Sequence, residues 1–447
     1  MDETRHVVIV GGGFAGLGCA LRLARNADLH VTLIDKHNYH QFQPLLYQVA
    51  TGEAAASEVA TGLRRWFRRR TNVDVKLGEV TAVDPTARRV TLASGQTVQG
   101  DFLVLAAGSQ PNFFHTPGAE HSYPLYSLED AQRLRARILA LFEAADRDPS
   151  LLDRGGLNFL TVGAGPTGVE TAGALADLIN KVMPYEYRDL AVQQARVILV
   201  ELTGTVLPPY TEKSRTYAAE VLQRRGVELR LNTSVKEIHT DRVLLSDGTT
   251  IPTQCVIWSG GLKAAPLAAS TGLTQGRGGR IDVQPDLRVP GHPGVYALGD
   301  FANIPAPDGR SFPQLGSVAL QSGQWTAKNI EAEIAGKPPR PFHYHDKGIM
   351  AMIGRNAAIA EMGEHRHELH GPIAFASWLG VHAWLMTGAR ARIEAFIDWG
   401  WDYFSKSRGP QVLDRTDVAR IDWGDDEDED AGAGVPSAED AVERAFR

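Results

Sequence analysis

Two copies of one glycine pattern, far apart in the chain, restrict its fold more than any other feature. Residues 6–16 read HVVIVGGGFAG, and residues 157–168 read LNFLTVGAGPTG. In both segments an apolar run leads into glycines spaced as G-x-G-x-x-G, and a helix-forming run follows. The next apolar run ends in an acid, Asp35 after the first copy and Glu201 after the second. A strand, a tight turn, a helix and a second strand in this order predict a unit that binds a dinucleotide.

Each glycine of the first copy has its own physical reason. Gly11 allows the tight turn, and Gly13 lets the backbone approach a pyrophosphate where any Cβ would collide. Gly16 lets the helix pack closely on the strand. The helix N-terminus offers N–H groups and the positive end of its dipole to the phosphates, and Asp35 can accept hydrogen bonds from a ribose. The alternative is a glycine-rich turn between a strand and a helix that binds nothing.

The second copy places Gly163, Gly165 and Gly168 in the same roles. Its acid, Glu201, favours a free ribose 2′-hydroxyl and would repel a 2′-phosphate. Residues 202–204 contain no arginine that could receive such a phosphate. We therefore expect this copy to bind NAD(H) rather than NADP(H).

The two units repeat beyond their glycines. Residues 90–108 read VTLASGQTVQGDFLVLAAG, and residues 243–261 read VLLSDGTTIPTQCVIWSGG. Each predicts two strands joined by a turn, then a buried strand that ends in glycine. The sequence therefore predicts an α/β chain in which one Rossmann-like domain is used twice. Two dinucleotide sites in one chain indicate that a hydride passes between two dinucleotides, for which FAD and NADH are the usual pair.

A third segment, VPGHPGVYALGD at residues 289–300, reads as a strand that ends in Gly299 and Asp300. It resembles a segment of the two-dinucleotide-binding flavoprotein reductases, in which the aspartate approaches the ribityl and pyrophosphate part of the flavin. The alternative is an aspartate that caps the next turn. The resemblance implies a discontinuous FAD-binding domain, with the NAD(H)-binding domain inserted into it.

Composition and charge restrict the compartment and the partners. The net charge is −7, and residues 425–447 alone hold nine acidic residues against two arginines. The rest of the chain is therefore close to neutral and gives nucleic-acid binding no support, and we expect the acidic tail to be disordered. We expect no signal peptide and no membrane-spanning segment. Cys19 and Cys255 are read as packing residues in a reducing compartment, so electrons must leave the flavin without a protein thiol.

Longer motifs resemble those of the type II NADH dehydrogenases, the single-subunit NADH:quinone reductases. They are DKHNYHQFQPLLYQVATG at 35–52, GAGPTGVETAG at 163–173, YALGDFA at 296–302, FPQLGSVALQSGQWTAKNI at 312–330 and FHYHDKGIMAMIGRNAAIAE at 342–361. The resemblance runs from about residue 6 to residue 413. It implies that one non-covalent FAD takes a hydride from NADH and that two electrons then pass to a membrane quinone, without proton pumping. No metal site is expected.

The resemblance also implies roles for particular residues. It places Glu170 near the nicotinamide, where a carboxyl group can support quinone protonation or charge-transfer geometry. On physical grounds, however, the helix dipole should lower the pKa of Glu170 and make it a poor acid. Lys347 matches a lysine beside the flavin ring, where a cation stabilises an anionic reduced flavin; the alternative is a solvated turn lysine. The other residues expected to contact the cofactors are Lys36, Gly108, Gly260, Asp300, Gln314 and Leu315.

One departure from the family pattern concerns the quinone. The family motif is usually A-Q-x-x-x-Q, and Gln321 matches its second glutamine, for which the resemblance implies a catalytic role. Ser317 stands in place of the first glutamine. A serine is too short to reach a quinone carbonyl in the same way, so the type of quinone, or the electron acceptor itself, stays open. The expected quinone-site residues are Gln43, Pro44, Leu45, Ser317 and Gln321.

The C-terminal region 377–413 has the composition of a membrane-surface element. An apolar stripe at helical spacing is flanked by amphipathic aromatic side chains and by basic residues that can snorkel. We expect peripheral attachment to the cytoplasmic face of the cell membrane. The alternatives are packing on the protein's own core or across a dimer, and a homodimer is implied by the resemblance alone. The stripe comprises Ile393, Phe396, Ile397, Gly400, Trp401 and Phe404, and the aromatic residues are Trp378, Trp384, Trp399 and Tyr403.

These patterns divide the chain into six segments. They are the first part of the FAD-binding domain (1–120), a connecting helical segment (121–155), the NAD(H)-binding domain (156–275), the second part of the FAD-binding domain (276–345), a C-terminal region with membrane-surface helices (346–420) and the acidic tail (421–447). Two other functions fit the same motifs. One is a soluble NADH-dependent flavoprotein reductase with a non-quinone acceptor, and the other is a redox sensor that binds FAD and NADH with little turnover.

Overall fold

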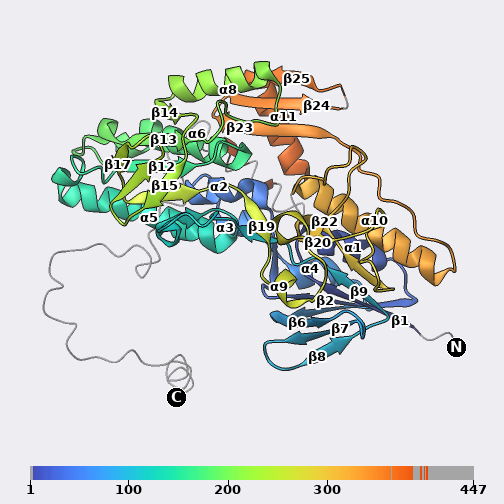
Figure 1. Cartoon of the computed structure of the whole chain (residues 1–447). Coiled ribbons are helices and arrows are strands. Elements are labelled where there is room, and N and C mark those ends of the chain that lie inside the picture. Colours follow the sequence, from blue (N-terminus) through green and yellow to red (C-terminus); the bar gives the residue numbers. More distant parts are fainter. Residues whose placement is uncertain (1–3, 364, 386–392, 395–396, 398, 401–447) are drawn as a thin grey trace, which may run out of the picture.

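A computed structural model describes residues 4–363, 365–385, 393–394, 397 and 399–400 of the chain. The expected acidic tail 421–447 and most of the predicted membrane-surface region 377–413 lie outside the described residues. Figure 1 shows the first glycine unit mainly in blue, the second mainly in green, and a smaller orange sheet against the second unit.

The first glycine unit forms a five-stranded parallel sheet with two helices packed beside it. Its elements are β1 (Arg5–Val10), α1 (Phe14–Leu23), β2 (Leu29–Asp35), β5 (Val73–Leu77), β9 (Phe102–Leu105), β21 (Val295–Ala297) and α10 (Gly316–Ile334). The strand order is β21-β9-β1-β2-β5, and Val7 of β1 pairs with Val31 on one side and Phe102 on the other. Strands buried on both faces read as continuous apolar runs, as residues 7–10 do. Helices α1 and α10 pack so closely that a Cβ on Gly323 would lie 2.0 Å from the backbone oxygen of Ala15.

The second glycine unit repeats this arrangement. Its elements are β11 (Tyr123–Pro124), α5 (Leu128–Arg147), β12 (Asn158–Val162), α6 (Pro166–Lys181), β13 (Arg196–Val200), α8 (Glu212–Arg224), β14 (Val227–Arg230) and β18 (Cys255–Trp258). The strand order is β11-β18-β12-β13-β14, and all pairs are parallel. Strand β21 belongs to the first sheet but follows the second unit in sequence. The expected fold class, two Rossmann-like domains of which the first is discontinuous, is confirmed.

Each unit also carries a small antiparallel sheet in the sequence just before a parallel strand, β9 in the first unit and β18 in the second. The strands are β6 (Val80–Asp84), β7 (Arg89–Leu92) and β8 (Thr97–Gln99) in the first unit, and β15 (Val235–Ile238), β16 (Arg242–Leu245) and β17 (Thr250–Pro252) in the second. The turns contain Gly95 and Gly248, whose φ angles of +81° and +85° suit glycine. The predicted internal duplication thus extends to the turns.

Shorter elements connect the units. They are β3 (Tyr39–Gln41), η1 (Gln43–Leu45), α2 (Leu46–Ala50), α3 (Ala56–Val59), β4 (Ala60–Gly62), α4 (Leu63–Phe67), β10 (Ser109–Pro111), η2 (Ala119–His121), η3 (Pro149–Leu151), α7 (Met183–Glu186), η4 (Val192–Gln194), β19 (Leu262–Ala264), α9 (Leu267–Ser270), η5 (Arg277–Gly279), β20 (Ile281–Asp282), η6 (Gly299–Phe301) and β22 (Ala302–Asn303). Strands β10 and β19 pair antiparallel, with Ser109 opposite Ala264, and tie the segments that follow the two parallel sheets.

The C-terminal region, in which membrane-surface helices are expected, begins with a sheet. An antiparallel sheet of β23 (Gly348–Gly354), β24 (Ala357–Met362) and β25 (His367–His370) comes first, and α11 (Gly371–Leu385) follows. The sheet lies on α6, where a Cβ on Gly173 would approach the backbone oxygen of Ile353 to 2.3 Å. Among the helices within the described residues, none is long and apolar enough to cross a membrane.

A buried ionic cluster fastens this sheet to the second unit. Asp177 of α6 accepts a hydrogen bond from the backbone N–H of Arg355 at 2.7 Å and pairs with Arg225, just beyond α8. Arg225 in turn donates to the backbone oxygen of Arg355 at 2.5 Å, and Lys181 pairs with the same aspartate at 2.5 Å. Three elements therefore meet on one carboxylate whose side chain is only 6% exposed.

We expect Asp177→Asn to lower the free energy of unfolding by about 3 kcal/mol, because it leaves Arg225 buried without its counter-charge. Denaturant unfolding followed by circular dichroism measures this. The control is Glu220→Gln, which breaks the exposed Glu220–Arg224 pair and should cost less than about 1 kcal/mol. Equal losses for the two variants would contradict this account of the cluster.

Candidate functional site

The first glycine turn holds its acid through a backbone N–H group. Gly11 has a φ of +103°, and a Cβ there would lie 2.2 Å from the backbone oxygen of Ala106. A Cβ on Gly16 would lie 1.8 Å from the backbone oxygen of Gly11. The N–H of Gly12 donates to Oδ2 of Asp35 at 2.6 Å. Strand, turn, helix and acid are therefore fixed as one unit.

The second turn reproduces these contacts. Gly163 has a φ of +93°, and a Cβ there would lie 2.7 Å from the backbone oxygen of Ser259. A Cβ on Gly168 would lie 1.8 Å from the backbone oxygen of Gly163. The N–H of Ala164 donates to Oε2 of Glu201 at 2.7 Å, as that of Gly12 does to Asp35. The two turns are equivalent in geometry as well as in sequence.

The middle glycine of each turn faces open space. Gly13 and Gly165 are the N-cap residues of α1 and α6, and both have extended backbones that any residue can adopt. A Cβ at either position would have no atom within 4 Å. Each helix N-terminus thus presents N–H groups to a space that a Cβ would enter, as a bound pyrophosphate requires. The residues fit two dinucleotides, one at each turn.

Asp300 lies in η6 directly after Gly299, and a Cβ on Gly299 would lie 2.9 Å from the Cβ of Ala15 beside the first turn. Its Oδ2 accepts a hydrogen bond from the hydroxyl of Ser109 at 3.1 Å, and its backbone oxygen accepts one from Nε2 of Gln314 at 3.2 Å. Burial raises the pKa of Asp300, while the Ser109 hydrogen bond and the charge of Arg280 oppose that rise. A carboxylate in this position can accept hydrogen bonds from the hydroxyls of a bound cofactor.

The other residues expected to contact the cofactors lie around the same turns. Gly108, with a φ of +73°, follows β9, and Gly260 follows β18 in the second unit. Leu315 is the N-cap residue of α10, and Lys36 is exposed next to the first acid. Ser109 was missed in the sequence, where only its position after a strand-end glycine could have indicated it.

Glu170 has surroundings that differ from those expected. It lies in α6 with 8% of its surface exposed, and the backbone N–H of Met352 donates to its Oε1 at 3.2 Å. Burial raises the pKa of Glu170 to about 8, although that hydrogen bond and the indole N–H of Trp378 lower it in part. The expected fall in pKa from the helix dipole was wrong, because β23 and α11 cover the side chain. Below about pH 8 this carboxyl group holds a proton.

Aromatic side chains gather around Trp378, whose indole lies beside Glu170. Trp378 is fully buried and stacks on His382, with ring centroids 3.8 Å apart. The ring centroids of Tyr47 and Trp378 lie 6.5 Å apart. The indole N–H of Trp399 donates a hydrogen bond to the side-chain oxygen of Gln48 at 3.2 Å. The expectation of a membrane-surface role for Trp378 was wrong, because α11 packs that face onto the core. Burial also lowers the pKa of His382 to about 4, so this imidazole is neutral.

The expected quinone-site residues fall into two groups. Gln43, Pro44 and Leu45 form η1; Leu45 is buried in the core, and the other two are half-buried. On α10, the hydroxyl of Ser317 lies 2.9 Å from that of Tyr344, and the two groups form a hydrogen bond.

Gln321 and Lys347 lie near the segment that leads into β23. The side-chain amide of Gln321 donates to the backbone oxygen of His345 at 3.0 Å and accepts from its N–H at 3.0 Å. Asp346 is paired with Arg366 at 3.5 Å, and Lys347 is exposed. Both the N–H and the oxygen of the Gln321 side-chain amide are therefore hydrogen-bonded to the backbone of His345, which precedes Lys347.

Both cysteines are fully buried as free thiols, in helix α1 and strand β18. Burial raises the pKa of the Cys255 thiol to about 12 and also raises that of Cys19. Neither is a thiolate at neutral pH, so their reading as packing residues is confirmed.

Comparison with known proteins agrees with this geometry. Residues 5–323 match the family described as pyridine nucleotide-disulphide oxidoreductase. The type II NADH:quinone oxidoreductase Ndh of Mycobacterium tuberculosis is 38% identical over 92% of this chain and 90% of its own length. A type II NADH:quinone oxidoreductase of Haemophilus influenzae is 27% identical over 80% and 87%.

Solved structures show the same fold. NDH2 from Plasmodium falciparum in complex with NADH superposes with a TM-score of 0.84 at 20% identity, over 92% of this chain and all of that one. The sulfide:quinone oxidoreductase of Aquifex aeolicus superposes with a TM-score of 0.68 at 19% identity, over 90% and 96%. From its two matched glycine turns, its family match and its relatives, this chain belongs to the type II NADH:quinone oxidoreductases of the pyridine nucleotide-disulphide oxidoreductase family.

Proposed function

We propose that the chain binds one non-covalent FAD at the first glycine turn and NADH at the second, and reduces a membrane quinone. The overall reaction takes NADH, one proton and quinone to NAD⁺ and quinol, without proton pumping. The two equivalent turns in one chain are the observation that carries this proposal. Asp300 supports the order of the sites, since it follows Gly299, which packs on Ala15 beside the first turn, and the resemblance implies that this aspartate approaches a flavin's ribityl chain.

The protein's own contribution is to position the reactants. A bound flavin supplies the two-electron chemistry. Asp35 and Glu201 keep lone pairs free beside their backbone hydrogen bonds and can accept from the ribose hydroxyls. Glu201 also disfavours a 2′-phosphate, which supports NADH over NADPH. With both thiols buried and protonated, the electrons pass outward to a diffusing acceptor.

Glu170 is proposed as the proton store beside the quinone. Its carboxyl group is buried among rings and is neutral up to about pH 8, so it can release a proton that reduction of the quinone consumes. His382, stacked on the same indole, is neutral and adds no competing charge. A raised pKa caused by burial and placed beside apolar rings is typical of a functional acid.

Gln321 is proposed to act indirectly. Its amide holds the backbone of His345, two residues before Lys347, and so fixes the segment that leads into β23. Gln43 and Pro44, the half-buried residues of η1, and the Ser317–Tyr344 pair remain the candidates for contact with the quinone. A homodimer remains a prediction from the resemblance.

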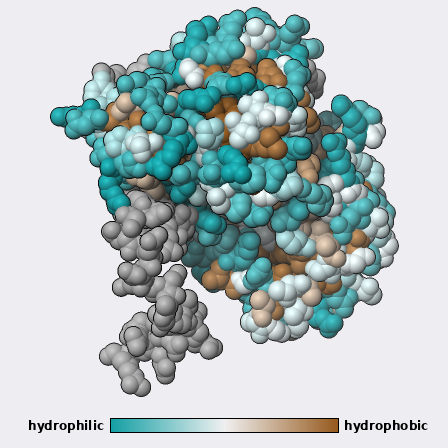
Figure 2. All heavy atoms as spheres, turned by 60° about the vertical axis from the view of Figure 1, so that its left-hand side comes forward, coloured by the Kyte–Doolittle hydropathy of each residue, from teal (hydrophilic) through white to brown (hydrophobic). Residues whose placement is uncertain are grey.

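Peripheral attachment to the cytoplasmic face of the cell membrane is part of the proposal. Ile373, Val381 and Trp384 of α11 are 69%, 40% and 73% exposed. At helical spacing these three residues fall within about 80° around the axis of α11. They form the apolar stripe of α11, which is separate from the stripe predicted at residues 393–404. Ile393 and Ile397 are exposed as well. The face of the molecule in Figure 2 is largely hydrophilic, with hydrophobic side chains in separate patches.

Steady-state oxidation of NADH, with menaquinone and ubiquinone analogues as acceptors, tests the proposed function. We expect turnover with NADH to exceed that with NADPH, and long-chain quinones to react faster in liposomes than without them. No rate on any quinone, together with reduction of a ferredoxin, would assign a different acceptor. A preference for NADPH would contradict the role of Glu201.

A matched pair of substitutions tests which cofactor binds at which turn. Gly13→Ala should leave apo-protein stability unchanged within about 1 kcal/mol, because the new methyl group enters open space, but should abolish FAD retention. Gly165→Ala should keep FAD and raise the KM for NADH at least about tenfold, a loss of about 1.4 kcal/mol. Flavin absorbance and NADH titration measure the two effects. Full FAD retention by Gly13→Ala would contradict the assignment.

Glu170→Gln tests the proton store. In wild type, quinone reduction should slow as pH rises through about 8, where Glu170 loses its proton, whereas the variant should be slower by about 100-fold and lack this step. The folded chain holds this proton to a higher pH than the unfolded chain does. Its contribution therefore makes wild type less stable as pH rises from about 4.5 to about 8.

The control for this variant is Glu361→Gln. Glu361 is also a buried carboxylate, in β24, and accepts the backbone N–H of Thr211 at 2.8 Å. It should keep the wild-type pH profile of quinone reduction. Unaltered flavin reduction and unaltered quinone reduction in Glu170→Gln would remove Glu170 from the mechanism.

A further inference from the structure

Five arginines are crowded into seven residues at helix α4. The buried residues Leu63 and Phe67 anchor this short helix to the core. Every arginine of the segment is exposed and lies on the opposite side or in the turn that follows. We call them the arginine cluster, and its members are Arg64, Arg65, Arg68, Arg69 and Arg70.

Within the described residues, the arginine cluster makes no ion pair. Arg64 donates to the backbone oxygen of Val75 at 2.9 Å. Over the part of the chain that the structure describes, no carboxylate lies within ion-pair distance of any of the five guanidinium groups. Other arginines are paired, as Arg22 is with Glu331 at 2.8 Å. Neighbouring like charges repel one another, so a partner rich in negative charge would stabilise this surface.

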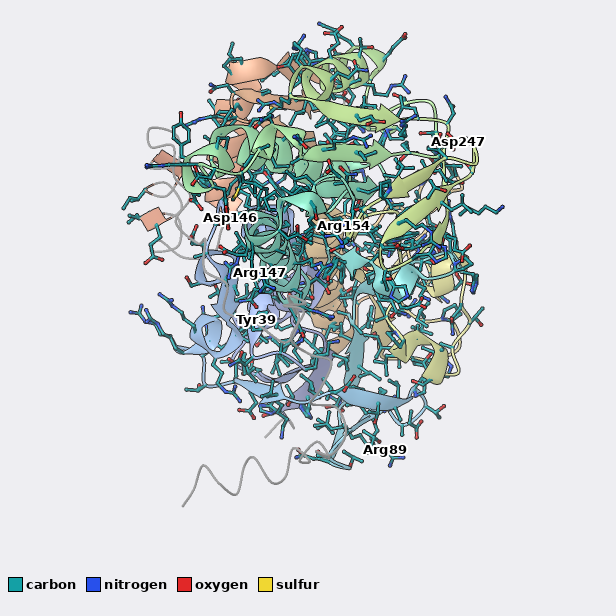
Figure 3. The ribbon with its side chains drawn as sticks, turned by 90° about the vertical axis from the view of Figure 1, so that its left-hand side faces the viewer. Tyr39, Arg89, Asp146, Arg147, Arg154 and Asp247 are labelled. Atoms are coloured by element: carbon teal, nitrogen blue, oxygen red, sulfur yellow. The ribbon has the colours of Figure 1, made fainter. Side chains whose placement is uncertain are left out.

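A chain of ring contacts through the protein links helix α4, which carries the cluster, to helix α11. Trp66 of α4 contacts His40, with ring centroids 6.4 Å apart, and His40 contacts Phe14 at 5.0 Å. Phe14 contacts Phe42 at 5.8 Å, and Phe42 contacts His382 of α11 at 6.2 Å. Figure 3 shows nitrogen-tipped side chains on the blue segment at the left edge, below the orange pieces of the C-terminal region.

We propose that the arginine cluster binds the anionic headgroups of the bilayer while the apolar stripe of α11 enters its acyl boundary. This inference rests on the proposed function, because a quinone reductase needs a bilayer as the source of its quinone. Guanidinium groups match phosphate oxygens in geometry and stay charged at every relevant pH. A basic patch next to an exposed apolar stripe is the combination that holds a protein on an anionic membrane surface.

The charge complementarity is specific to this face. The chain as a whole is acidic, at −7, so its average charge gives it no attraction to an anionic surface. The five arginines, which make no ion pair within the part of the chain that the structure describes, reverse this locally. The attraction fades within about 10 Å in ordinary salt, so only a cluster close to the headgroups contributes. Anionic lipid should therefore orient the enzyme with α4 and α11 toward the bilayer.

The test compares full-length enzyme carrying Arg68→Gln and Arg69→Gln with a control carrying Arg89→Gln and Arg242→Gln. The control removes the same charge far from the cluster: Arg89 is labelled toward the lower right of Figure 3, and Arg242 lies in β16, in the sheet beside Asp247. Cosedimentation is measured with phosphatidylcholine vesicles, with and without phosphatidylglycerol, and at low and high salt. Turnover is measured in parallel with a water-soluble quinone and no lipid.

At roughly fivefold per charge, the cluster variant should bind anionic vesicles about 25-fold more weakly than wild type, and the control should match wild type. High salt should remove the difference. Turnover with the water-soluble quinone should be the same in all three proteins. Absence of turnover with the water-soluble quinone in wild type would refute the proposed function. A cluster variant that binds anionic vesicles as tightly as the control variant does would refute the inference alone.

Two further measurements distinguish the bilayer from two other possible partners of the arginine cluster, a nucleic acid and the chain's own acidic segment. A short duplex DNA that binds wild type more tightly than the anionic vesicles do, and loses affinity in the cluster variant, would overturn the proposal. The same vesicle measurement on chains that end at residue 424 tests the acidic segment 425–447. We expect the 25-fold ratio of vesicle affinities, wild type over the cluster variant, to persist in the shortened chains. A ratio that vanishes without this segment would assign the arginines to it instead.

Discussion

The hydrogen bond from a turn N–H to a strand-end carboxylate, made once in each glycine unit, organises the rest of the structure. Gly12 donates to Asp35, and Ala164 donates to Glu201. Each bond can form only because the neighbouring helix approaches its strand without an intervening Cβ. The close packing of helix on strand leaves open space at the helix N-terminus, and the carboxylate lies at the edge of that space. Two such edges in one chain create the paired sites on which the proposed electron transfer depends.

Around this pair, the protein controls charge mainly through burial. Both thiols are protonated, Glu170 is neutral up to about pH 8, and the imidazole of His382 is uncharged. The two titratable groups beside Trp378, Glu170 and His382, are therefore both neutral at pH 7. Such surroundings suit a neutral acceptor that takes up protons together with electrons. The Asp177 cluster and the arginine cluster hold charged groups in other parts of the molecule.

Local rules made much of the fold predictable from the sequence. The glycine spacing, the strand-end acids and the repeated hairpins follow from the geometry of one recurring strand–turn–helix–strand unit, and the structure contains all of them. The sheet β23–β25 and the burial of Trp378 depend on packing against α6, which no local pattern reports. The pKa of Glu170 differs from the sequence-based expectation for the same reason. The helix dipole follows from the local sequence, whereas the burial of the Glu170 side chain depends on packing by distant elements. The amide of Gln321 is bound to His345, which motif matching could not reveal.

Anaerobic double-mixing stopped flow tests the central claim most directly. Purified enzyme is first mixed with one equivalent of NADH and then with a quinone, while flavin absorbance is recorded. The account predicts that NADH bleaches the flavin completely and that quinone restores the oxidised spectrum, both at rates at least equal to steady-state turnover. Bleaching by NADH without recovery on addition of quinone would show that the electrons leave this chain for a different acceptor.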